Sequence, residues 1–387
     1  MKGLDYPKGF RVGVASAGIK KPGRNDVAVI VSETLSDVAG VFTTNLFAAA
    51  PVKYCREILQ KNMQVRAIVV NSGNANAGTG EAGYKDTVEM AEITAHELNC
   101  RSGEVLAAST GVIGRRLPMD KIRAGIKSAI ESCRDISHGD SAASAIMTTD
   151  TVEKIAEREI DGIRIGGIAK GAGMIHPNMA TMLCFLTTDA DLPRNLIQPM
   201  LKRVADRTFN CISVDNDTST NDSLILMANG TAGKVDEKRF ESTLEDICDE
   251  LAKKIVADGE GATKFVTIEV KDAKNEIEAY KAADAVATSM LVKTALFGND
   301  PNWGRILAAV GRSGAEIDVE KVKISVCGFT IFEKGGPLEL DLAKVSERMK
   351  TGKIDIEIKF GLGAAQKRVF TTDLSREYVS INADYTT

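Results

Sequence analysis

The sequence predicts an α/β or α+β fold, in which helices are layered on sheets in two lobes. Short segments rich in β-branched residues alternate with amphipathic segments along the chain, a mixture typical of sheets covered by helices. The chain has 387 residues, of which 44% are hydrophobic, so it can bury a large core, and its length favours two domains or lobes. We find no repeat, low-complexity tract or Pro/Gly/Ser-rich linker.

The predicted strands are short runs of β-forming residues bounded by turn residues. They cover residues 26–32, 65–70, 104–108, 163–169, 181–187, 223–227, 264–270, 321–326 and 354–360. The predicted helices carry apolar residues three and four positions apart, which gives each helix one apolar face. They cover residues 81–97, 120–133, 194–207, 241–256, 276–296 and 342–349.

The charge of the chain argues against a nucleic-acid-binding protein. Lys and Arg number 49 and Asp and Glu number 53, so the net charge is −4. The basic runs are short, and only 5% of the residues are aromatic. Binding to nucleic acid needs clustered positive charge, so we expect none.

The cysteines and the N-terminus favour a cytoplasmic protein. The seven cysteines are odd in number and include no Cys-x-x-Cys pair, so we expect free thiols in a reducing compartment. Residues 1–5 lack the apolar segment of a signal peptide. Since no apolar run approaches the length of a membrane span, we also expect no membrane association.

Glycines, of which there are 34, gather in three clusters that follow predicted strands, at residues 71–78, 109–114 and 166–174. Backbone N–H groups in such turns can face a ligand, although any one of them is also compatible with an ordinary tight turn. Three together favour a site built at strand ends. Nucleotide binding is unsupported, because Gly-x-Gly-x-x-Gly is absent and Lys170 lacks the Walker A context.

Thr181 heads an apolar strand and directly follows the small residue Ala180. A threonine hydroxyl is a weak nucleophile and needs a base, and the chain has only three histidines. If the backbone broke before Thr181, the new α-amino group would lie beside the hydroxyl and could act as that base near neutral pH. Composition alone favours an ordinary strand residue at this position.

Residues 170–184 closely resemble the cleavage-site signature of the ornithine acetyltransferase family, whose bifunctional members are also glutamate N-acetyltransferases. They read Lys-Gly-Ala-Gly-Met-Ile-His-Pro-Asn-Met-Ala-Thr-Met-Leu-Cys. Further blocks in the family's order extend the resemblance over most of the chain. They lie at residues 71–77, 109–114, 145–151, 258–264, 299–305 and 378–387.

The resemblance implies that the chain cuts itself between Ala180 and Thr181, which would give chains of residues 1–180 and 181–387. Thr181 would then take acetyl from N-acetylornithine and pass it to glutamate in a ping-pong reaction. The family assembles as an α2β2 heterotetramer, and its sandwich-type fold is reminiscent of N-terminal-nucleophile hydrolases. No bound cofactor is implied. Bifunctional members also use acetyl-CoA as a co-substrate, and the shared motifs leave that activity open.

The same resemblance assigns the oxyanion hole and part of the substrate site. The hydroxyl of Thr110 and the N–H of Gly111 would stabilise the tetrahedral intermediate. Lys170 would bind a substrate carboxylate as a point charge. The Thr-Thr turn would also contact substrate, through Thr148 rather than Thr149.

Two further parts of the substrate site come from the second half of the chain. Glu260 would bind the distal end of the substrate and pair with the ammonium of ornithine. Asn382 and Thr387, with Thr181 itself, would complete the site, which requires an ordered C-terminus. Residues 378–381 have a strand-like composition, which favours order over a frayed tail.

Three tempting features receive no catalytic or metal-binding role. His176 precedes a proline and is interpreted as a loop residue. Cys184 is interpreted as a buried strand residue, because nothing nearby in sequence would lower its pKa. Residues 215–222 resemble a calcium loop in composition but lack its glycine and late glutamate, so we predict no metal site.

Two other functions remain compatible with the sequence. An N-terminal-nucleophile amidohydrolase would cut itself in the same way but would use water instead of an acceptor amino acid. A non-catalytic amino-acid-binding protein would stay intact and would tolerate substitution of Thr181.

Overall fold

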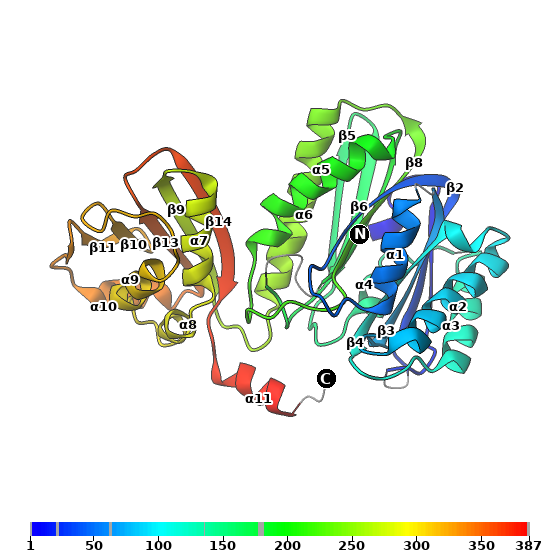
Figure 1. Ribbon diagram of the computed structural model, residues 1–387, viewed down its shortest axis with the longest axis horizontal. Coiled ribbons are helices and arrows are strands. Elements are labelled where there is room, and N and C mark those ends of the chain that lie inside the picture. Colours follow the sequence, from blue (N-terminus) through cyan, green and yellow to red (C-terminus); the bar gives the residue numbers. More distant parts are fainter. Residues whose placement is uncertain (1, 21–22, 62–63, 135, 177–181, 385–387) are drawn as a thin grey trace. The chain divides into compact units, whose positions relative to one another are not determined.

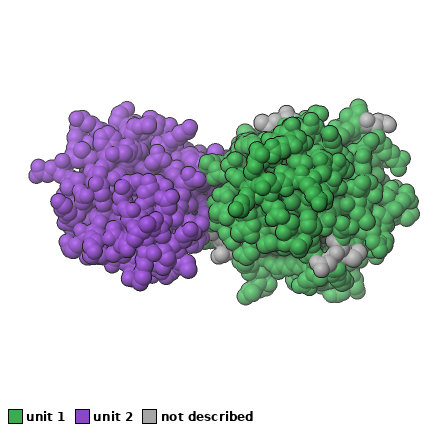
Figure 2. Space-filling model, turned by 90° about the horizontal axis from the view of Figure 1, so that it is seen from above, with its two compact units in different colours: residues 1–210, 217–255, 387 green, residues 211–216, 256–386 purple. Residues whose placement is uncertain are grey.

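The computed structural model describes residues 2–20, 23–61, 64–134, 136–176 and 182–384, which form two compact units. Unit 1 comprises Met1–Asn210 and Asp217–Ile255, and unit 2 comprises Cys211–Asn216 and Val256–Thr386. Figure 1 labels most of their helices and strands, and Figure 2 colours unit 1 green and unit 2 purple. The mixed α/β class and the two lobes are confirmed, whereas the division into chains 1–180 and 181–387 stays a prediction.

The sheet of unit 1 runs in the order β4-β3-β2-β8-β7-β6-β5, with β1 paired to β2. The pairs β3–β4 and β7–β8 are parallel and the others are antiparallel. The strands are β1 (Phe10–Ala15), β2 (Val27–Phe42), β3 (Val65–Asn74), β4 (Val105–Val112), β5 (Lys154–Ile160), β6 (Ile163–Lys170), β7 (Leu183–Ala190) and β8 (Ser223–Gly233).

Strand β2 is long enough to join two halves of this sheet. Its first part pairs with β3, its residues Asp37–Phe42 pair with β8, and the register with β3 shifts between Val31 and Ser36. Such irregularities bend a strand and increase its twist. One half therefore contains β1, β3 and β4, and the other contains β5 to β8.

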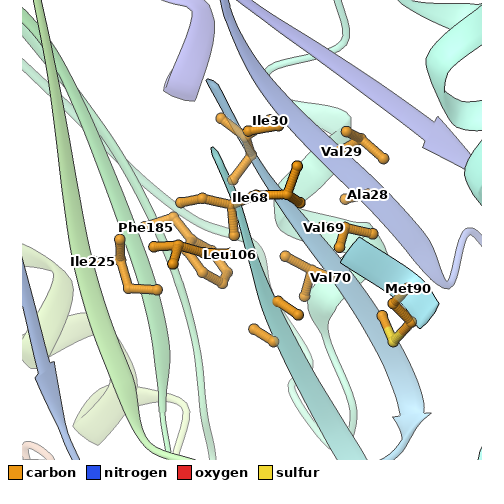
Figure 3. Packing of buried hydrophobic residues seen from close by; sticks show 14 of the residues in the cluster. Ala28, Val29, Ile30, Ile68, Val69, Val70, Met90, Leu106, Phe185 and Ile225 are labelled. Carbon is orange, nitrogen blue, oxygen red and sulfur yellow. The ribbon is translucent and has the colours of Figure 1, made fainter. Parts of the chain in front are cut away.

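The two halves bury their facing surfaces against each other. Figure 3 shows Phe185 of β7 and Ile225 of β8 pointing toward Ile68 of β3, while the next residue, Val69, points the other way, toward Met90. Successive side chains of a strand face opposite sides of a sheet, so the β3 half is buried on both faces. This explains why β3 is apolar without alternation between apolar and polar residues.

Helices cover the outer faces of the two halves (Figure 1). Helix α2 packs on β3 and β4, and α3 packs on β1 and β2. On the other half, α6 lies so close to β6 that a Cβ added at Gly167 would be 3.1 Å from Leu251. The helices of unit 1 are α1 (Ala50–Gln60), α2 (Gly80–Leu98), α3 (Met119–Ser132), α4 (Ser141–Ile146), α5 (Arg194–Arg207) and α6 (Glu237–Ala257).

Unit 2 is a second sheet, in the order β12-β11-β10-β13-β9-β14, with helices packed against it. Strands β9 and β13 are parallel and the remaining pairs are antiparallel. Its strands are β9 (Phe265–Ala273), β10 (Lys323–Val326), β11 (Phe329–Glu333), β12 (Gly336–Pro337), β13 (Lys353–Lys359) and β14 (Ala365–Thr372). Its helices are α7 (Glu276–Ala287), α8 (Met290–Phe297), α9 (Trp303–Gly311), α10 (Leu342–Met349) and α11 (Arg376–Asp384).

The C-terminal segment is ordered through residue 384, in line with the expectation of an ordered terminus. Residues 378–381, whose composition is strand-like, lie in the helix α11. The hydroxyl of Ser375 accepts a hydrogen bond from Tyr378 N over 3.2 Å, which satisfies an N–H at the start of this helix. The β-branched residues of the segment make no strand because α11 buries none of its residues, so no neighbouring sheet selects the extended form.

Two expectations about secondary structure are wrong in detail. The helix predicted over 276–296 is broken into α7 and α8, because Ser289 caps α8 by accepting from Val292 N. The glycine cluster at 166–174 does not simply follow a strand, since Gly166 and Gly167 lie inside β6. A Cβ on Gly166 would be 2.0 Å from the carbonyl oxygen of Gly3, so close packing requires glycine there.

The seven cysteines are all free thiols. No helix within the described ranges is both long enough and apolar enough to cross a membrane.

The face-to-face packing of the half-sheets predicts a strong dependence of stability on its central residues. Ile225→Ala should lower the free energy of unfolding by about 2–5 kcal/mol, because this fully buried side chain would leave a cavity. Urea denaturation measures the loss. The matched control is Leu35→Ala on β2. Because Leu35 is 41% exposed, this substitution should lower the free energy of unfolding much less. Equal losses in the two variants would contradict this packing.

Candidate active site

Buried polar side chains gather where the ends of β4 and β6 meet the start of β7. Lys170 closes β6 and Thr110 lies near the end of β4, and both are at least 95% buried. The Nζ of Lys170 donates to the hydroxyl oxygen of Thr110 over 3.5 Å. Lys170 also pairs with Leu183 across the β6–β7 ladder. The fold therefore brings two sequence-predicted residues together, beside the strand that follows Thr181 in sequence.

Thr110 and Gly111 are held on a tightly constrained backbone. An ammonium group can only donate, so the oxygen of Thr110 accepts from Lys170 and its own hydrogen stays available to donate. Gly111 has φ 131°, and a Cβ there would lie 2.3 Å from the carbonyl carbon of Gly73 on the paired strand β3. Only glycine fits this contact, which fixes the loop as a preorganised oxyanion hole requires.

Asp150 is a buried carboxylate that the sequence analysis did not single out. Its Oδ1 accepts hydrogen bonds from Lys154 Nζ over 2.8 Å and from Gly171 N over 2.6 Å. Burial by itself would raise the pKa of Asp150, but the charges of Lys170 and Lys154 outweigh it and lower that pKa to about 2. The carboxylate is therefore ionised at neutral pH, and it holds the backbone directly after Lys170.

Thr148 belongs to the same cluster. It is partly buried, and its N–H donates to the Oδ2 of Asp150 over 3.1 Å. The chain before it is held by Lys20, whose Nζ donates to the carbonyl oxygens of Ala145 and Met147 over 3.0 and 2.9 Å. One carboxylate thus fixes both the turn that carries Thr148 and the turn that follows β6.

Glu260 and Asn382 come together in unit 2. The Nδ2 of Asn382 donates to Glu260 Oε2 over 3.0 Å and to the carbonyl oxygen of Tyr378 over 3.0 Å. The neighbouring Gly261 has φ 64°, and a Cβ there would lie 2.4 Å from Tyr378 N. The loop of Glu260 thus fits closely against α11, and two residues that the sequence separates by 122 positions become neighbours.

Ala180, Thr181 and Thr387 lie outside the described residues, so their roles stay predictions. Cys184 on β7 is fully buried, and burial raises the pKa of its thiol well above the usual value, which opposes a nucleophilic role. Burial lowers the pKa of His176, with Asp217 opposing this effect, so the imidazole is neutral at pH 7.

Other parts of the described structure offer weaker candidates. A cleft of about 390 Å³ lies beside Phe47, Lys53 and Tyr84, but its described lining includes neither Thr110 nor Lys170. Within residues 2–384, apart from the undescribed gaps, no group of three or more His, Cys, Asp and Glu side chains could hold a metal ion. The strand ends are therefore the better candidate.

Sequence reasoning missed the residues that support the site. Asp150, Asn221 and Asp222 are all buried, and each lies in a segment that the sequence analysis quoted for other reasons. For Asn221 and Asp222 the usable signal was a short acidic or amide side chain just before the predicted strand 223–227, whereas Asp150 lies beside no predicted strand. Burial, which makes such a residue informative, is not visible in the sequence.

The buried ion pair predicts an acid-sensitive contribution to stability. Asp150→Asn should cost about 3–5 kcal/mol at pH 7, because the buried Lys154 loses its carboxylate partner. The folded-state pKa of Asp150 lies below that of an unfolded aspartate, so its contribution is present at neutral pH and is lost as the pH falls toward about 2. Urea denaturation at pH 7 and pH 3 should therefore show a smaller difference between variant and wild type at pH 3.

Asp120→Asn is the control for that measurement, since Asp120 pairs with Arg123 through a fully exposed side chain. It should change stability much less than Asp150→Asn does, because solvent screens an exposed ion pair. A loss in Asp150→Asn no larger than in this control would contradict the described ion pair.

The sequence of this chain is similar to those of known proteins over nearly its whole length. The arginine biosynthesis bifunctional protein ArgJ of Synechocystis sp. is 46% identical, with 99% of this chain and 98% of that protein covered. Glutamate N-acetyltransferase of Methanocaldococcus jannaschii is 46% identical, with 100% and 98% covered. The crystal structure of ArgJ from Bacillus halodurans shares 37% identity and a TM-score of 0.50, covering 52% of this chain and 98% of that chain. The ArgJ family model matches residues 11–387, and the chain belongs to that family.

Proposed function

We propose that this protein is an acyltransferase of arginine biosynthesis, which moves an acetyl group from N-acetylornithine to glutamate through Thr181. Similarity to an ArgJ protein and to a glutamate N-acetyltransferase over nearly the whole chain supports the reaction class. One observation carries the site: Lys170 contacts Thr110 and pairs with Leu183. A cation and a hydroxyl donor thus lie beside the strand that Thr181 precedes.

Maturation begins with an attack by the hydroxyl of Thr181 on the carbonyl carbon of Ala180. The peptide C–N bond breaks, the nitrogen of Thr181 takes up the hydroxyl proton, and an ester joins the two residues. Water then hydrolyses the ester, which leaves a carboxylate on Ala180 and returns a proton to the hydroxyl. The new α-amino group of Thr181 becomes the base that the scarce histidines do not supply.

Acetyl transfer uses the same hydroxyl in two half-reactions. The α-amine takes the proton of Thr181, whose oxygen attacks the acetyl carbon of N-acetylornithine, and the proton passes to ornithine as its C–N bond breaks. The amine of glutamate next attacks the acetyl ester, loses a proton to the α-amine, and displaces the threonine oxygen, which regains a proton. In both intermediates, Thr110 and Gly111 donate to the oxyanion.

The charges of the site suit amino-acid substrates. Lys170 and Lys154 both act on the single carboxylate of Asp150, and this local excess of positive charge favours a substrate carboxylate. Glu260 and Asn382 offer an acceptor and a donor 3.0 Å apart for the distal end of the substrate. Thr148 and Thr387 complete the proposed contacts.

The two chains should remain together after the cut. Strands β2 and β6 precede residue 181, and they pair with β8 and β7, which follow it. Backbone hydrogen bonds within one sheet therefore hold residues 1–180 to residues 181–387.

We propose an α2β2 assembly in the cytoplasm, with no resident cofactor. Incubation with acetyl-CoA and glutamate distinguishes a bifunctional enzyme from a monofunctional one.

Self-cleavage is the first prediction of this function. The wild-type chain should separate on a denaturing gel into pieces of 180 and 207 residues, with Thr181 as the new N-terminus, and Thr181→Ala should stay at 41.4 kDa. Intact-mass analysis locates the cut. An intact wild-type chain would remove the proposed base and favour a binding protein. Cleavage with acetyl release but no dependence on an acceptor amino acid would favour an amidohydrolase.

The oxyanion hole makes a separate prediction about rate. Thr110→Val keeps the side-chain shape but removes the donor, so kcat should fall about 10²–10³-fold with a smaller change in KM. Steady-state assays of acetyl transfer measure both constants. Thr94→Val in α2 is the control, because it also removes a fully buried hydroxyl, one that bonds only the helix backbone. A kcat for Thr110→Val equal to that of the control would refute the assignment.

A further inference from the structure

Two consecutive residues before β8 bridge the two sides of the candidate site. Asn221 and Asp222 are 6% and 0% exposed, and neither has a role in the proposed reaction. Asn221 contacts the strand that carries Thr110, while Asp222 contacts the residue that follows Thr181. We propose that Asn221 and Asp222 are positioning residues, which set the nucleophile in register with the oxyanion hole. This inference rests on the proposed function.

Asn221 holds the oxyanion side. Its Nδ2 donates to the carbonyl oxygen of Ser109 over 2.8 Å and to that of Ala75 over 2.6 Å. The hydroxyl of Thr220 donates to its Oδ1 over 2.6 Å, so the amide is oriented with Nδ2 toward the two carbonyl groups. Ser109 immediately precedes Thr110. The amide therefore ties β8 to the backbone of β4 one residue before the oxyanion donors.

Asp222 holds the nucleophile side. Its Oδ1 accepts from the N–H of Met182 over 2.9 Å, and Ser223 N donates to the carbonyl oxygen of Met182 over 3.1 Å. The nitrogen of Met182 belongs to the peptide bond that joins it to Thr181. Three covalent bonds, together no longer than about 4.3 Å, separate it from the α-nitrogen of Thr181. Fixing Met182 N thus restricts where the proposed base and hydroxyl can lie.

The chemistry of Asp222 is unusual for a purely structural residue. Its carboxyl is fully buried, with the side chain of Thr43 beside it. Burial raises the pKa of this carboxyl well above the usual value, although Met182 N–H, Lys170 and the Thr43 side chain oppose the shift. An amide oxygen at this position could still accept from Met182 N–H, whereas an alkyl side chain could not. We therefore expect asparagine, but not leucine, to replace it.

The experiment uses the full chain and compares variants beside the candidate site with control variants farther along β7 and β8. Asn221→Asp keeps the size but removes both donors, and Asp222→Leu removes the acceptor. In each, the pieces of 180 and 207 residues should form about tenfold more slowly, and kcat should fall about tenfold with KM nearly unchanged. Asp222→Asn should behave like the wild type. Timed intact-mass analysis and steady-state assays give these rates.

Asp189 and Asn229, at the far ends of β7 and β8, are the matched controls. Asp189 is also a fully buried carboxylate that accepts backbone N–H groups, from Arg164 over 2.7 Å and Lys8 over 3.1 Å. Asn229 donates to the carbonyl oxygen of Lys8 over 2.8 Å. Asp189→Leu and Asn229→Asp should lower the thermal stability as much as the site variants do, yet cleave and turn over normally.

Wild-type rates in Asn221→Asp and Asp222→Leu would overturn the inference. So would equally slow cleavage in Asp189→Leu and Asn229→Asp, because the effect would then follow stability and not position. Failure of Asp222→Asn to keep the wild-type rates would show that more than an acceptor for Met182 N–H is needed, which contradicts a positioning role through that hydrogen bond. A wild-type chain that stays whole and transfers no acetyl would refute the proposed function itself, and this inference with it.

Discussion

The candidate site depends on the ionised carboxylate of Asp150, which is buried between two lysines. Without Lys154 and Lys170, burial would favour the neutral acid, and the carboxylate could not hold the chain on both sides of the site. With them, it fixes the amides of Thr148 and Gly171. A single buried charge thus orders both the turn at residues 148–150 and the turn that follows β6.

Close backbone contacts impose the second constraint. Gly111 approaches β3 so tightly that any side chain would overlap the backbone of Gly73, and Gly261 meets the start of α11 in the same way. These contacts fix backbone positions more firmly than side-chain packing could, because no rotamer change relieves them. The loop of Thr110 and Gly111 in unit 1 and the loop of Glu260 in unit 2 are therefore each held firmly in their own surroundings. Rigidity of this kind is what preorganised catalysis needs.

Sequence patterns predicted helices with one apolar face and strands that are runs of β-forming residues. Helices α5 and α10 begin and end where expected, since their apolar residues recur at helical spacing and few other signals compete. The patterns missed the strands β1, β5, β11, β12 and β14 and the helices α1, α4, α9 and α11. Nearness in the chain did not help, since β5 was missed although it forms a tight hairpin with the predicted strand β6. Helix α11 is the clearest case, because its local composition favours a strand and its context does not.

The sequence by itself determined the α/β class and the family, and it predicts an activated threonine, because these inferences depend on residue identity and local order. It also singled out Thr110, Lys170, Glu260 and Asn382 individually. Only the tertiary structure decided that Lys170 contacts Thr110, that Asp150 is the buried counter-charge, and that Asn221 and Asp222 bridge β4 and β7. The physical reason is that burial and charge pairing arise from strand order and register, which bring together residues that no local pattern connects.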